Sequence, residues 1–221
     1  MERSDEIVRS EVVETLSRDS RVNTARITVV VEQGRVVLRG DAPTLYTIHV
    51  AMELAACVCG VQSVHSELDV TRPASSPSDD AILNYAGQVL RWNVSTGAGK
   101  IRVRVDGGML TLEGEVDAYW KRNRAELLML DIEGIVGVVN KLVVVPELTP
   151  QDKVIADDVK SAIARCTGMG REHIEVEVRQ GLVTLTGNVS NLWSKQTTPH
   201  LAETILGVKG VIDNLVVAAR D

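Results

Sequence analysis

The stretch from Ile174 to Thr186 reads Ile-Glu-Val-Glu-Val-Arg-Gln-Gly-Leu-Val-Thr-Leu-Thr. Apolar and polar side chains alternate in the run before Gly181 and again in the run after it. Alternation with a period of two is typical of a β-strand with one buried face, and a glycine between two such runs indicates a tight turn. The stretch therefore predicts a β-hairpin.

This hairpin pattern occurs three times along the chain. Gly34, Gly108 and Gly181 lie 74 and 73 residues apart. Other glycines and aliphatic residues keep the same two offsets: Gly40, Gly114 and Gly187; Gly60, Gly134 and Gly207; Ile27, Ile101 and Ile174. A fixed period of this length is typical of tandem copies of one small unit. We therefore predict three domains, at residues 1–72, 78–147 and 150–221.

Each copy also contains two helical patterns and a final apolar run. Before the hairpin, a polar cap (Ser4, Ser78 or Thr149-Pro150) precedes apolar residues spaced by four, which predicts an amphipathic helix. After the hairpin come an Ala- and Leu-containing helical stretch and a short Val-rich strand. The predicted fold class is α+β, with the order helix, strand, strand, helix, strand in every repeat.

The third strand of each repeat runs parallel to the second, which leaves two possible sheets. It could lie beside the second strand in a mixed sheet, or beside the first strand in an antiparallel one. We favour the mixed three-stranded sheet, with both helices on one face, because a right-handed strand–helix–strand crossover produces it directly.

The period of two also predicts which side chains lie on the open face of each sheet. Arg102 and Arg104 are expected there in the second repeat, and Glu175 and Glu177 in the third. Their opposite charges make them candidates for an inter-repeat surface, within one chain or between chains. The alternative is two solvated polar faces.

Composition narrows the classes of function. The chain has 221 residues, a net charge of −6 and no Phe, and its aromatic content of 3% argues against nucleic-acid binding. It lacks a long apolar run, and three Cys residues make a disulfide framework unexpected. The first residues do not form a signal peptide, so the sequence as written predicts a cytoplasmic protein; removal of an export segment would make it periplasmic.

The pattern of helix, alternating run, Gly-x-Val/Leu-x-Leu-x-Gly, helix and Gly-Val-x-x-Val resembles the BON domain, named for bacterial osmotically inducible and nodulation proteins. In the first copy the resemblance is carried by Gly34, Val36, Leu38, Gly40, Gly60, Val61 and Val64. It implies a non-enzymatic module of bacterial envelope and stress proteins that is proposed to bind phospholipid surfaces. Pro199 departs from the pattern and is expected to kink the second helix of the third copy or to delay its start.

One local cluster could contact a membrane. Tyr119, Trp120, Lys121, Arg122 and Arg124 bring three cations and two aromatic rings to the start of a helix in an otherwise acidic chain. Such residues suit anionic phospholipid headgroups. The alternative is a packing role for the ring, because Tyr46 and Trp193 occupy the position of Trp120 in the other repeats.

No set of residues predicts catalysis, a metal or a cofactor. Cys57 and Cys59, with His49 and His65 nearby in sequence, do not complete a tetrahedral metal site, and we expect these thiols to be buried. Cys166 has no partner that would activate it. The sequence thus predicts a binding protein for a phospholipid membrane or a protein partner. The alternative is a cytoplasmic scaffold that self-associates, as a possible homo-oligomer, without binding lipid.

Overall fold

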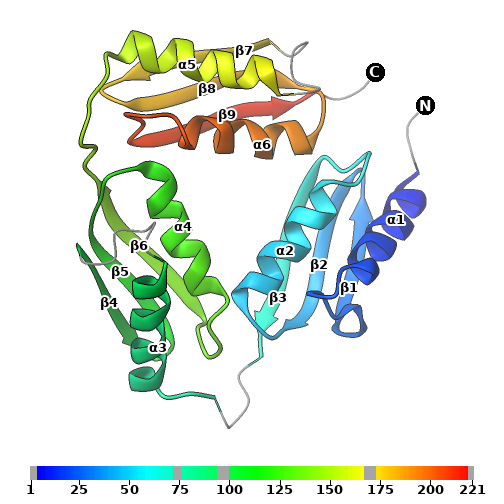
Figure 1. Cartoon of the computed structure of the whole chain (residues 1–221). Helices are drawn as coiled ribbons and strands as arrows, with labels where there is room; N and C mark the ends of the chain where they lie inside the picture. The colour runs from blue at the N-terminus through cyan, green and yellow to red at the C-terminus, as the bar shows by residue number, and fades with distance from the viewer. Residues whose placement is uncertain (1–3, 72–75, 94–99, 167–172, 219–221) are drawn as a thin grey trace. The chain divides into compact units, whose positions relative to one another are not determined.

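The structure is a computed structural model that describes residues 4–71, 76–93, 100–166 and 173–218. Three copies of a helix–strand–strand–helix–strand unit follow one another along the chain (Figure 1). The first repeat contains α1 (Asp5–Arg18), a 3₁₀ turn (Thr24–Arg26), β1 (Ile27–Glu32), β2 (Arg35–Ala42), α2 (Leu45–Ala56) and β3 (Ser63–Val70). The second contains α3 (Asp79–Trp92), β4 (Ile101–Asp106), β5 (Met109–Val116), α4 (Tyr119–Leu130) and β6 (Gly137–Val144). The third contains α5 (Asp152–Arg165), β7 (His173–Arg179), β8 (Leu182–Val189), α6 (Leu192–Glu203) and β9 (Gly210–Val217).

Each repeat has its own three-stranded sheet. The strand orders are β1-β2-β3, β4-β5-β6 and β7-β8-β9. In the first and third repeats the hairpin pair is antiparallel and the last strand runs parallel to the middle one. The mixed sheet predicted from the sequence is therefore confirmed. The first and last strands of every repeat lie at the two ends of its sheet.

The core of each repeat lies between its sheet and its two helices. The apolar stripe of the first helix is fully buried in every copy: Val8, Val12 and Leu16; Ile82, Ala86 and Leu90; Ile155, Val159 and Ile163. In the third repeat these residues pack with Val183, Leu185 and Leu215 from the sheet. The helical period of four and the strand period of two thus bring one apolar face of each element together.

The hairpin turns use a left-handed backbone. Gln180 and Gly181 have φ values of 53° and 80°. The pair Gly107 and Gly108 has φ values of 58° and 81°. Positive φ at both central residues is the geometry of a two-residue hairpin loop whose twist matches that of its strands. It also points two successive backbone N–H groups to one side of the turn.

An aspartate at the start of each first helix binds this turn. The Asp152 carboxylate accepts hydrogen bonds from Gln180 N at 2.7 Å and Gly181 N at 2.9 Å. Asp5 and Asp79 do the same for the turns of their own repeats, at distances between 2.7 and 3.0 Å. We call these three residues the turn anchors. Each one joins two segments 28 to 29 residues apart, and so fixes the first helix over its hairpin.

The structure corrects one predicted helix cap and one of the two effects expected of Pro199, the delayed start. Gln151, not Thr149-Pro150, occupies the N-cap of α5, and Ser4 caps α1 without a side-chain hydrogen bond. The start of α6 is not delayed by Pro199, because the helix runs from Leu192 to Glu203 with the proline inside it. Nearby, Thr198 Oγ1 donates a hydrogen bond to the carbonyl of Ser194 at 2.7 Å.

Candidate functional site

The basic residues at the start of α4 differ in how they are engaged. Lys121 Nζ lies 2.7 Å and 2.8 Å from the two carboxylate oxygens of Asp117, and the Lys121 side chain is only 20% exposed. Its ammonium group also lies 5.7 Å from the centre of the Trp120 ring. Asp117 therefore neutralises much of the charge that Lys121 could offer to a ligand.

Arg122 is bound to the end strand of its own sheet. Its Nε donates to Leu142 O at 3.2 Å, and its Nη2 donates to Asn140 O at 3.0 Å. In return, Asn140 Nδ2 donates to Arg122 O at 3.0 Å and to Glu126 Oε2 at 2.9 Å. These bonds occupy backbone carbonyls that the end strand β6 would otherwise present to solvent. The sequence did not reveal this role, because Asn140 is 18 residues from Arg122.

Arg124 is the exposed cation of the predicted cluster. The rings of Tyr119 and Trp120 are half-buried, and the Arg122 guanidinium lies 5.9 Å from the centre of the Tyr119 ring. In the other repeats, Tyr46 is half-buried and Trp193 is exposed. The structure thus places all five predicted residues at the start of one helix, with Arg124 pointing its charge to solvent.

The predicted inter-repeat residues lie on the open faces, as the strand period indicated. Arg102 and Arg104 are exposed on β4, and Glu175 and Glu177 are exposed on β7. Both strands are end strands of their sheets. Glu177 also forms an ion pair with Arg179 on the same strand. Whether the two sets of charges meet stays a prediction.

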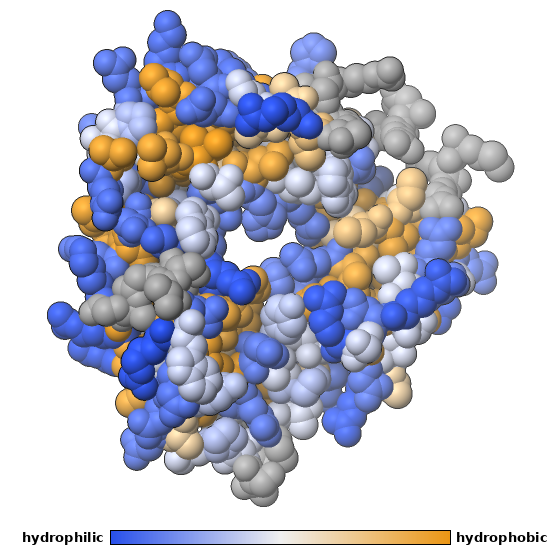
Figure 2. Space-filling view, in the orientation of Figure 1, coloured by the Kyte–Doolittle hydropathy of each residue, from blue (hydrophilic) through white to orange (hydrophobic). Residues whose placement is uncertain are grey.

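Apolar side chains are also exposed on the open faces of the second and third repeats. Val143 is 58% exposed on β6 and Val216 is 59% exposed on β9. Figure 2 shows the opposite, helix-covered side of the sheets, where apolar surface, in orange, lies among mostly hydrophilic side chains. In the first repeat, the open face instead carries an ion pair between Arg39 Nε and Glu67 Oε2, at 2.7 Å. The repeats therefore have similar, separate cores but differ in the side chains that their open faces present.

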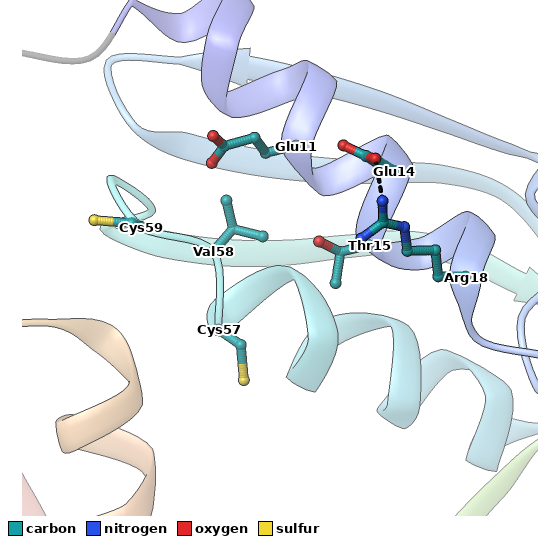
Figure 3. A pocket seen from close by; sticks show the side chains of 7 residues that line it. All are labelled: Glu11, Glu14, Thr15, Arg18, Cys57, Val58 and Cys59. Atoms are coloured by element: carbon teal, nitrogen blue, oxygen red, sulfur yellow. Dashed lines mark hydrogen bonds and ion pairs between the residues drawn. The ribbon is translucent and has the colours of Figure 1, made fainter.

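A shallow hollow in the first repeat contains two of the cysteines. It has a volume of about 350 Å³ and is lined by Glu11, Glu14, Thr15, Arg18, Cys57, Val58 and Cys59 (Figure 3). The expectation that these thiols are buried is wrong, because α2 ends at Ala56 and both cysteines lie exposed in the turn that follows. Partial burial and the nearby Glu53 raise the pKa of Cys57. The two thiols point in different directions (Figure 3).

The described residues contain neither a metal-binding cluster nor a membrane-spanning helix. No group of three His, Cys, Asp or Glu side chains there could hold a metal ion. None of the helices in that part of the chain is long and apolar enough to cross a bilayer.

Comparison with known proteins identifies the repeat. The model of the BON domain family matches three times, at residues 4–72, 78–146 and 151–219. The chain belongs to the BON domain family. A related BON-domain chain is the osmotically-inducible protein Y of Escherichia coli strain K12, 22% identical over 188 residues, which are 76% of this chain and 94% of that protein.

Solved structures give a more distant likeness to this BON-domain protein. The C-terminal domain of CdsD, a structural protein of the type III secretion system of Chlamydia trachomatis, is 14% identical with a TM-score of 0.27, covering 99% of this chain and all (100%) of that one. The PrgH periplasmic domain is 10% identical with a TM-score of 0.22, covering 88% of this chain and 95% of that one. Scores this low assign neither partners nor assembly to the BON-domain chain.

Proposed function

We propose that this BON-domain protein is a non-catalytic binding protein of the osmotic stress response that contacts anionic phospholipid through the start of α4. The observation that supports this most directly is the exposed Arg124, which lies one helical turn after the half-buried Trp120. The first and third repeats lack this combination, since they have Val50 and Thr197 where the second has Arg124. The lipid contact therefore belongs to the middle repeat.

The contacts within α4 limit the strength of such binding. A cation near an anionic membrane contributes about 1 kcal/mol. Lys121 is paired with Asp117, so it adds little. Arg122 keeps its positive charge, because its hydrogen bonds go to neutral carbonyls, but its side chain is turned toward β6. Arg124 and Arg122 together would supply about 1–2 kcal/mol, which corresponds to weak, salt-sensitive binding.

A liposome sedimentation assay tests the proposal. We expect the wild-type chain to sediment with vesicles of phosphatidylglycerol at low salt, and not with vesicles of phosphatidylcholine. Arg124→Glu should abolish the binding without disturbing the fold, because Arg124 is exposed. Lys160→Glu, on the exposed side of α5, is the matched control and should bind like the wild type. Equal sedimentation of Arg124→Glu and wild type would rule out the α4 site.

A second candidate function is a protein-interaction or self-assembly scaffold that does not bind lipid. It is favoured by the engagement of Lys121 and Arg122 in contacts within their own repeat. It is also favoured by the exposed apolar side chains on β6 and β9. A wild-type chain that fails to sediment with anionic vesicles even at low salt would support this alternative over lipid binding.

A further inference from the structure

The first strands of the second and third repeats present backbone groups at the open end of their sheets. In a two-residue hairpin, the residues that close the turn exchange hydrogen bonds, and the pairing then alternates along the strands. In β7 the closing residue is Arg179, paired with Leu182. The N–H and C=O groups of Ile174, Val176 and Val178 therefore point away from β8. By the same rule, Ile101, Val103 and Val105 of β4 point away from β5.

The first repeat supports this assignment and shows a difference. Arg9 Nε of α1 donates to Val29 O at 3.2 Å, so the carbonyl of Val29 does point to the outer side of β1. In the other repeats the position of Arg9 is taken by Leu83 and Ala156, which have no side-chain donor. The corresponding edges of β4 and β7 therefore lack this arginine cover.

The open-face charges of β4 and β7 are inverted, position by position. Arg102, Arg104 and Asp106 of β4 correspond in the repeat to Glu175, Glu177 and Arg179 of β7. The signs run plus, plus, minus on β4 and minus, minus, plus on β7. Two strands with opposite charge sequences can stabilise a shared sheet through cross-strand pairs.

We propose that β4 of one chain pairs antiparallel with β7 of a second copy, so that their two sheets join edge to edge. The register has Val103 opposite Val176, because both residues point their backbone groups outward. This single choice aligns all six residues of β4 with compatible partners. The facing pairs are Ile101 and Val178, Arg102 and Glu177, Val103 and Val176, Arg104 and Glu175, Val105 and Ile174, and Asp106 and His173.

The pairing has favourable features on both faces of the joined sheet. The charged pairs are the non-hydrogen-bonded ones, in which the two side chains approach most closely. The apolar pairs lie on the helix-covered face, where Ile101, Val103 and Val105 are still half-exposed in the single chain. Joining the edges would bury these side chains, so hydrogen bonds, charge and apolar burial all favour the same register.

The charges also act against other pairings. Two copies of β4 paired in the equivalent register would oppose Arg102 to Arg104, and two copies of β7 would oppose Glu175 to Glu177. A shift of β4 by two residues toward the hairpin turn after β7 would place Arg102 opposite Arg179. Like charges that face each other across a sheet are destabilising. The pattern therefore selects the β4–β7 contact over its competitors.

The linker between the repeats leaves little room for this contact within one chain. Val145 is held to its own sheet by a hydrogen bond from its N–H to Val116 O at 2.7 Å. Pro150 packs against Gly207, because its Cδ lies 2.6 Å from where a Cβ on Gly207 would be. Gly207 in turn lies next to Gly181, the residue before β8, because its carbonyl oxygen is 2.7 Å from where a Cβ on Gly181 would be. Five residues of chain reach at most about 18 Å. The path from β6 to β8 across the joined sheet is four strand spacings, or about 19 Å. A contact within one chain would stretch the linker to its limit, so we take a second copy as the partner of each edge.

Sedimentation velocity without lipid tests the proposal, with the two strands reversed in charge separately. The full-length wild-type chain should self-associate as its concentration rises. Arg102→Glu with Arg104→Glu should weaken association about tenfold or more for each contact, as should Glu175→Arg with Glu177→Arg. A mixture of the two double variants should form mixed oligomers, because the reversed strand of one matches the reversed strand of the other. The control, Arg26→Glu with Arg35→Glu, changes two exposed arginines of the first repeat by the same charge as the arginine double variant of β4 and should associate like the wild type.

Hydrogen exchange at low and high protein concentration provides a second readout. The amides of Val103 and Val176 should gain protection with concentration, whereas those of β6 should not. A wild-type chain that stays monomeric, or double variants that associate like the wild type while circular dichroism shows intact folds, would overturn the proposal. Failure of the mixture to associate would also overturn it. None of these results depends on whether the α4 site binds lipid.

Discussion

Replacing Asp152 by Ala removes the turn anchor of the third repeat. The lost interactions are the hydrogen bonds from Gln180 N at 2.7 Å and Gly181 N at 2.9 Å. A hydrogen bond to a charged group contributes about 1.5–3 kcal/mol, and water can replace part of this at the exposed Gln180 amide. The loss of a negative charge from the first turn of α5 costs about 0.5 kcal/mol more. We expect the free energy of unfolding to fall by about 2–3 kcal/mol.

Native-state hydrogen exchange in the full chain measures this loss repeat by repeat. Amides of β7 and β8 should exchange faster in Asp152→Ala, while those of β1 and β2 should keep their wild-type rates. Asp152→Asn retains one acceptor oxygen and should lose about half as much stability. Asp158→Ala, an exposed site on the same helix, is the control. A loss of less than about 0.5 kcal/mol in Asp152→Ala, or a loss equal to that of the control, would refute the role of the anchor.

Three further predictions concern single side chains. Gln180→Gly should raise the free energy of unfolding in urea by about 0.5 kcal/mol, because the left-handed backbone is costly for a residue with a Cβ; a destabilised variant would contradict this. Arg122→Gln should lower the free energy of unfolding, measured by thermal denaturation, by about 1–2 kcal/mol, because Arg122 binds β6. Arg124→Gln should lower it by less than about 0.5 kcal/mol, and equal losses in the two variants would contradict this role of Arg122. The side-chain hydrogen bond from Arg21 lowers the pKa of Asp19 from 3.8 to about 2. The pair therefore stabilises the fold above pH 3.8, and this stabilisation is lost as the pH falls toward 2. A carbon-13 NMR titration should show a higher pKa for Asp19 in Arg21→Gln than in the wild type.

The fold could be predicted from the sequence because its determinants are local and repeated. The alternation of apolar and polar residues around Gly181 predicted a hairpin, and the apolar residues spaced by four before it predicted a helix. The constant offsets of the glycines showed that this unit is repeated. The order of the strands was less constrained, since a parallel third strand fits two sheets. The crossover rule favoured the mixed sheet, and the structure has it.

The roles of individual polar residues were harder to predict, because they depend on contacts between distant segments. The repeat offsets do carry Asp5 onto Asp79 and Asp152, and this signal could have revealed the turn anchors. An acidic residue in a first turn, however, is already explained by the helix dipole. Arg122 looked like a free cation, because nothing near it in sequence showed that the carbonyls of β6 lie beside it.

The turn anchors have a consequence for how such proteins can change in length. Each anchor binds a hairpin of its own repeat, and the fully buried side chains in the core of the third repeat all come from that repeat. Solenoid proteins behave differently, since their inner units need neighbours and their outermost ones need special polar faces. Gene duplication or deletion can therefore add or remove a copy while the fully buried side chains of a core such as this one stay together, and each duplicate is then free to acquire a surface of its own.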